Sequence, residues 1–151
     1  MRYSSWPRFL LSGCAVLSKQ ELKPAAKTLS HGRLVYLADS YCRRADLRLR
    51  RHRSGKGCLA AIAYLRRVYL PEFDRLLFQL HGLTPPPWDV VAYRRMLATA
   101  NDIDLVAHHF FQAADELQIR RAKPLIPRLR RLGNRFQARA KRVGLKTCAK
   151  D

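Results

Sequence analysis

Basic residues crowd the C-terminal part of this 151-residue chain, and no acid accompanies them. No Asp or Glu lies between Glu116 and Asp151. The same stretch holds twelve basic side chains: Arg120, Arg121, Lys123, Arg128, Arg130, Arg131, Arg135, Arg139, Lys141, Arg142, Lys146 and Lys150. Charges of one sign at this density repel one another unless an anionic surface offsets them. Arginine also pairs bidentately with phosphate, so the chemistry predicted here is polyanion binding.

A second basic cluster lies earlier in the chain and opposes seven basic side chains to the single acid Asp46. Its members are Arg43, Arg44, Arg48, Arg50, Arg51, Arg53 and Lys56. The segment 54–57, Ser-Gly-Lys-Gly, places backbone N–H groups and a lysine where an anion could sit. It lacks the spacing of a Walker phosphate loop, and a plain turn between helices is the favoured interpretation.

Both clusters fall on segments with the apolar periodicity of amphipathic helices. The pattern predicts one helix from Arg33 to about His52 and a final helix from Pro127 to Val143, each with an apolar face and an arginine back. If these helices pack side by side, their arginine faces would form one continuous phosphate clamp.

The rest of the chain predicts further helices and no strands. We expect helices over 58–70, 71–81, 88–98 and 102–121, and a short one over 19–29. Pro71 and Asn101 are expected to open two of them. The predicted fold is all-α, a single compact domain of five to six helices around residues 58–80, with a mobile C-terminal end. Its predicted parts are a segment of uncertain structure (1–17), a helical core (18–121) and the basic helix with its tail (122–151).

Other chemistry finds little support. A helix-turn-helix over 88–121 is disfavoured because its second helix carries four acids that phosphates would repel. His108 lies one turn after Asp104, yet a metal site in a bundle needs more ligands, so we expect a surface pair, no metal and no cofactor. Motifs of the common hydrolases and nucleotide-binding enzymes are absent, which favours a protein without enzymatic activity.

Cysteines and hydropathy bear on the compartment. The four cysteines lack metal-site spacing and are sparse for a disulfide framework, so reduced thiols and a cytoplasmic location are predicted. Leu11-Ser12-Gly13-Cys14 has the form of a lipoprotein cleavage box, but too few apolar residues precede it, and coincidence is the favoured interpretation.

A net charge of +19 points to nucleic acid as the partner. The excess of arginine over lysine, 22 to 8, fits this partner and equally fits a genome of high GC content. The predicted function is a non-enzymatic nucleic-acid-binding accessory or regulatory protein that grips the phosphate backbone of DNA or RNA. The alternatives are a basic adaptor or inhibitor that docks on an acidic protein, or a peripheral protein of anionic membranes. Tyr3, Trp6, Tyr36 and Trp88 are candidates for stacking on bases, whereas Phe78 and five other aromatic residues fall on apolar faces and are assigned to the core.

Overall fold

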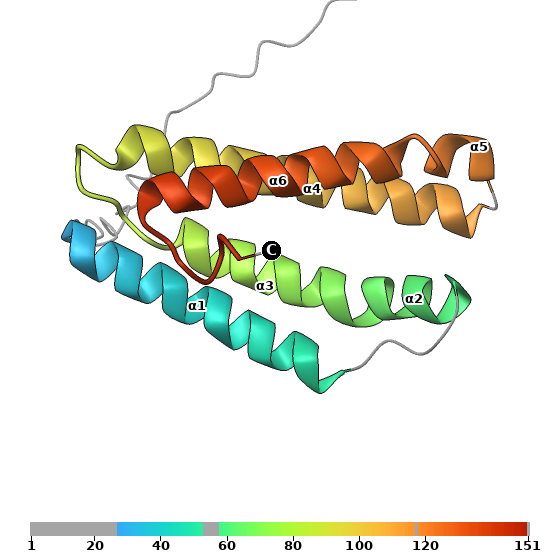
Figure 1. Ribbon diagram of the computed structural model, residues 1–151, viewed down its shortest axis with the longest axis horizontal. Helices are drawn as coiled ribbons and strands as arrows, with labels where there is room; N and C mark the ends of the chain where they lie inside the picture. Colours follow the sequence, from blue (N-terminus) through green and yellow to red (C-terminus); the bar gives the residue numbers. More distant parts are fainter. Residues whose placement is uncertain (1–26, 53–57, 117, 151) are drawn as a thin grey trace, which may run out of the picture.

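The computed structural model describes residues 27–52, 58–116 and 118–150, which form four helices and no strand (Figure 1). The first is α1 (His31–Arg51), and the second joins α2 (Cys58–Tyr64), the π-helical turn η1 (Leu65–Tyr69) and α3 (Leu70–His81). The third is α4 (Val90–Asp115), and the fourth is α6 (Leu125–Val143) with the short α5 (Ile119–Ala122) before it. The all-α class is confirmed, but the prediction of five to six helices is wrong.

One predicted break, at Pro71, does not occur. Proline lacks the N–H that a helix interior needs, and its ring crowds the preceding turn. The chain accommodates it with the wide turn η1, in which the N–H of Leu70 donates to the carbonyl of Leu65, five residues back. The π-turn thus carries the helix through Pro71 instead of ending it.

A second predicted break, at Asn101, is also absent. Asn101 lies inside α4 and does not cap a new helix; its Oδ1 is 3.0 Å from Nε2 of His81 on α3. The apolar face continues across this point, because Leu97, Ala100 and Ile103 are all buried. A helix-turn-helix is therefore ruled out at 88–121 by the backbone itself.

The core is centred on α4, which packs against both α6 and α3, while α1 packs on α3. Tyr93 and Met96 of α4 are fully buried, and the Tyr93 hydroxyl donates to the carbonyl of Leu80 at 2.8 Å. The predicted centre at residues 58–80 is wrong for its first half, since Leu65 is exposed. Phe78, assigned to the core from the sequence, is 81% exposed.

The ends of the two arginine-rich helices are set by local chemistry. The Ser30 side chain accepts a hydrogen bond from the N–H of Arg33, so α1 begins at His31. Residues 27–29 are not helical, so the predicted helix over 19–29 is wrong for this part. Gly144 ends α6 in the left-handed conformation (φ 93°), which glycine adopts without steric cost. The rest of the predicted helix over 19–29 lies outside the described residues.

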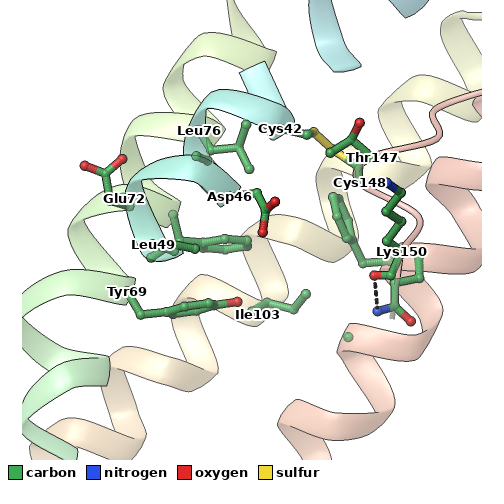
Figure 2. A pocket seen from close by; sticks show the side chains of 15 residues that line it. Cys42, Asp46, Leu49, Tyr69, Glu72, Leu76, Ile103, Thr147, Cys148 and Lys150 are labelled. Carbon is green, nitrogen blue, oxygen red and sulfur yellow. Dashed lines mark hydrogen bonds between the residues drawn. A yellow bond between two sulfur atoms is a disulfide. The ribbon is translucent and has the colours of Figure 1, made fainter. Parts of the chain in front are cut away.

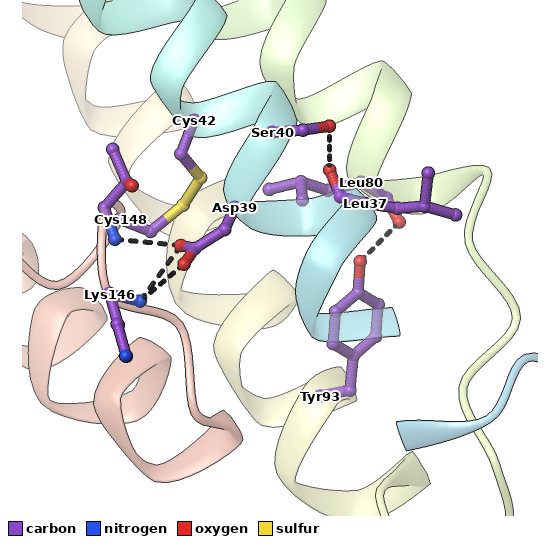
Figure 3. The surroundings of a disulfide bond; sticks show 9 residues. Leu37, Asp39, Ser40, Cys42, Leu80, Tyr93, Lys146 and Cys148 are labelled. Carbon is purple, nitrogen blue, oxygen red and sulfur yellow. Dashed lines mark hydrogen bonds between the residues drawn. A yellow bond between two sulfur atoms is a disulfide. The ribbon is translucent and has the colours of Figure 1, made fainter. Parts of the chain in front are cut away.

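The segment after α6 is fixed to α1, contrary to the expected mobile end (Figure 3). Leu145 is buried, and a disulfide joins Cys148 to Cys42 on the core face of α1. The Asp39 carboxylate accepts hydrogen bonds of 2.8–3.0 Å from the N–H groups of Lys146 and Thr147. The prediction of reduced thiols is therefore wrong for this pair.

Within the described ranges, no helix combines the length and the apolar character that crossing a membrane requires.

Candidate polyanion interface

Helix α6 carries five of its six arginines along one edge, beside α4. Leu132, Phe136, Ala140 and Val143 are its buried seam. Five arginines follow each other at spacings of three, four, four and three residues, which keeps them on one side of a helix. We call them the α6 strip: Arg128, Arg131, Arg135, Arg139 and Arg142. They span the fifteen residues 128–142, about 21 Å of helix.

Arg139 fixes the orientation of the strip relative to α4. Its guanidinium donates to the carbonyl of Arg95 at 2.7 Å and also to the hydroxyl of Thr99, which is fully buried. The other four members of the strip are exposed. The strip therefore runs along the outer margin of the α4–α6 pair, anchored at one point and open to solvent elsewhere.

No carboxylate within the described ranges lies within 4.0 Å of any basic side chain of α6. Arg130 and Lys141, which lie on the opposite flank from the strip, are exposed as well. Unpaired guanidinium groups held on a rigid helix have no internal partner to give up when an anion binds. Binding of an anion to the α6 surface would therefore break no ion pair among the described residues and would reduce the repulsion between its arginines.

Helix α1 differs, because part of its arginine face is already engaged. Arg48 Nε lies 2.5 Å from Glu72 of α3, and Arg50 Nε lies 2.9 Å from Asp46. The Arg44 guanidinium lies 4.9 Å from the centre of the Tyr41 ring. Arg43 and Arg51 are exposed. Two of the predicted binding residues are therefore structural ion-pair partners as well.

The two arginine helices do not pack side by side, so the condition for a continuous clamp is not met. In Figure 1, α6 lies with α4 and α1 lies with α3, and the C-terminal segment runs between the pairs. A cavity of about 260 Å³ is lined by residues of both helix pairs and of the C-terminal segment, among them Asp46 of α1, Gln137 of α6 and Lys150 (Figure 2). The flank of α1 that faces α6 carries Asp39 and Asp46, whereas Arg48 faces α3. Arg48 therefore points away from α6, while Arg50 pairs with Asp46 on the other flank of α1.

The remaining predicted binding residues lie at the margins. Arg120 and Arg121 of α5 and the following Lys123 are exposed at the end of the bundle where α6 begins. They extend the basic surface of α6 beyond its first turn. Arg53 and Lys56, with the turn that holds them, lie outside the described residues.

An acidic cluster on the α3–α4 side was only half found in the sequence. The expected Asp104–His108 pair is present at 3.4 Å, and Asp74 of α3 joins it, with one ligand atom of each residue within 4.8 Å of the others. Burial, and then the hydrogen bond and charge of Asp104, raise the pKa of Asp74 above its ordinary value, while the charge of His108 opposes them. Helical spacing links Asp104 to His108, but only the packing of α3 on α4 brings in Asp74.

The chain matches no protein-family model, no curated protein and no solved structure. Its function has to be argued from the arrangement of its own residues.

Proposed function

We propose that this chain is a non-enzymatic nucleic-acid-binding protein, accessory or regulatory in role, which grips the phosphate backbone through the α6 strip. The observation that carries the proposal is that no carboxylate of the described residues pairs with that strip, in a chain with a net charge of +19. Nucleic acid is the polyanion that proteins of this charge most commonly meet. The exposed arginines of α1, which include Arg43, Arg44 and Arg51, form a second basic surface.

Binding through phosphates has a measurable dependence on salt. If all five strip arginines neutralise phosphates, the slope of log affinity against log salt is about −4.5 for duplex DNA and about −3.5 for a single strand. Raising salt from about 50 to about 200 mM would then lower the affinity about 500-fold for the duplex and about 130-fold for the single strand.

The test is fluorescence anisotropy with labelled duplex DNA, single-stranded DNA and RNA of equal length, at both salt concentrations. Heparin and anionic liposomes serve as competitors for the other partner classes. The expected result is tight binding with the steep salt dependence given above, and nucleic acid that co-purifies with the protein and is removed by nuclease. Failure of every nucleic acid to compete with heparin or liposomes would contradict the proposal and favour the adaptor or membrane-surface alternative.

The cytoplasmic location stays a prediction, and the disulfide now bears on it. Disulfides persist in oxidising compartments and are rare in the cytosol. A cytoplasmic location therefore requires Cys42 and Cys148 to be reduced in the cell. Alkylation of free thiols at the moment of lysis, followed by mass spectrometry of the two cysteines, tests this requirement.

A further inference from the structure

Trp88 is an exposed aromatic side chain on a rigid base. Its side chain is 73% exposed, although burying an indole is ordinarily favourable. Pro86, two residues earlier, is fully buried, and its carbonyl accepts a hydrogen bond of 2.9 Å from the N–H of Asp89. The Asp89 carboxylate in turn contacts His31 at 2.7 Å. The backbone on both sides of Trp88 is thus held in place while the ring stays in solvent.

The α6 strip runs toward this indole. Trp88 lies in the turn just before α4, and Ala92, Arg95 and Thr99 follow at spacings of three and four residues on the side of α4 that Arg139 contacts. Because α4 and α6 are antiparallel, Arg142, one turn after Arg139, lies level with the α4 turn before Arg95. Trp88 comes two residues before Val90, the first residue of α4, and α4 begins at the end of the bundle where α6 ends (Figure 1). Val91, 59% exposed, extends the apolar surface there.

The other exposed aromatic residues do not share these properties. Tyr36 is 65% exposed, but the guanidinium of Arg33 lies 5.5 Å from the centre of its ring and occupies that face. Phe78 is on α3, one turn after Asp74, and α3 packs on α1 and α4, with no α6 neighbour of comparable extent. Among the described residues, Trp88 is therefore the aromatic side chain that combines exposure, a backbone held by hydrogen bonds and a position at the end of the bundle toward which the α6 strip runs.

We propose that Trp88 is a base-stacking platform at the end of the α6 strip, and that the preferred ligand is single-stranded nucleic acid. The inference rests on the proposed function and deepens it. Proteins that bind single strands combine a basic groove or track for the backbone with aromatic rings on which unpaired bases stack. Duplex bases are already stacked on their neighbours and offer no free face to the indole. The arginines hold the phosphates, and Trp88 selects the strand that can present a base.

Tryptophan fluorescence tests this directly, because the chain has only two tryptophans. In a Trp6→Phe variant, Trp88 is the only fluorophore of its kind. Titration with a thymidine dodecamer is expected to quench the emission with the same midpoint as the anisotropy of a labelled strand. A 12-bp duplex should bind with little quenching.

Substitution separates stacking from charge. Trp88→Ala should lower single-strand affinity about 5- to 150-fold, the range measured for loss of one stacked base, and leave duplex affinity within about twofold. Phe78→Ala is the matched control, since it removes an equally exposed aromatic ring from another face, and circular dichroism checks that both variants fold. Trp88→Phe should recover part of the loss.

The outcomes distinguish this inference from the function beneath it. Single-strand binding without quenching, and unchanged in Trp88→Ala, would overturn the platform and leave the phosphate grip standing. Equal quenching and equal loss with the duplex would overturn the preference for single strands. Absence of binding to any nucleic acid would overturn both.

Discussion

Helices α1 and α6 resemble each other in sequence and differ in how their charges are used. Both are amphipathic, close to twenty residues long and rich in arginine. Helix α1 also carries Asp39 and Asp46, and Arg48 reaches Glu72 on the neighbouring helix. Helix α6 has no acidic residue, and no carboxylate of the described neighbouring elements reaches its basic side chains.

The difference shows that arginine content alone does not identify a binding surface. An arginine that already has a carboxylate partner loses part of that interaction when it turns to a phosphate, whereas an unpaired one does not. Repulsion among unpaired charges also costs folding stability, and anion binding relieves it. Under the proposed function, we expect the arginines of α1 to contribute mainly to the stability of the bundle and those of α6 mainly to ligand binding.

The largest expected effect concerns the link between the two helices, the disulfide between α1 and the segment after α6. It closes a loop with a sequence separation of 106 residues, and its loss in a Cys42→Ser, Cys148→Ser variant should lower the free energy of unfolding by about 2–5 kcal/mol. Urea unfolding with and without dithiothreitol measures this. If the α6 strip acts independently of α1, nucleic-acid affinity of the folded variant should stay within about twofold; a parallel loss of affinity would contradict the division of roles.

The next effect compares the binding surfaces themselves. Arg131→Gln, Arg135→Gln and Arg142→Gln together remove three exposed charges from the α6 strip. Affinity for nucleic acid at low salt should fall about 100-fold, or about 2.7 kcal/mol, and the salt slope should weaken by roughly two to three.

The matched control removes the same charge from α1, with glutamine at Arg43, Arg44 and Arg51. Its affinity should fall less than about tenfold, because α1 lies on the other side of the bundle. Anisotropy at matched ionic strength measures both triple variants. Equal losses of affinity would show that the two helices share one ligand and that binding is not confined mainly to α6.

Much of the fold was accessible from the sequence because helical periodicity is local. The bounds of α1 and α6 were predicted to within about two residues. The errors arose where a long-range contact overrode a local preference. Asn101 is a good cap, but continuous burial on both sides keeps α4 whole, and η1 absorbs Pro71.

The site was predicted in composition but not in arrangement. Periodicity places the arginines on the outer faces of α1 and α6, yet it carries no information on which helices are neighbours. The Arg48–Glu72 pair joins residues 24 positions apart, and the disulfide joins residues 106 apart, so both depend on the packing of the bundle. The exposure of Phe78 was missed for the same reason, since no helix of the described ranges covers its face of α3.

A smaller effect separates a structural arginine from a free one. Glu72, mostly buried, holds Arg48 at 2.5 Å and Arg75 at 2.7 Å, so Glu72→Gln should lower the free energy of unfolding by about 1–2 kcal/mol. Arg131→Gln on α6 should change it by less than about 0.5 kcal/mol, in either direction. Urea unfolding of both variants, compared with the wild type, measures the contrast. A destabilisation of Arg131→Gln comparable to that of Glu72→Gln would mean that α6 also depends on its charges for folding.

The smallest expected effect lies on the acidic side of the bundle, where the like-charge contact is between two carboxyl groups, Asp74 and Asp104, and not between arginines. The pKa of Asp74 is raised by burial and by its contact with Asp104, so folding favours the protonated form. The contribution of Asp74 to the free energy of unfolding therefore falls as pH rises from the pKa of Asp74 in the unfolded chain through its higher pKa in the folded protein. Asp74→Asn removes this loss, so its melting temperature relative to wild type should rise between about pH 3.5 and 7. Taking the difference cancels the repulsion among basic residues common to both proteins, and Asp102→Asn, outside this cluster, controls for the change in net charge. A melting-temperature difference between Asp74→Asn and wild type that stays constant across this pH range would mean that the contact does not lower the free energy of unfolding. Repulsion in this protein would then be confined to the arginines.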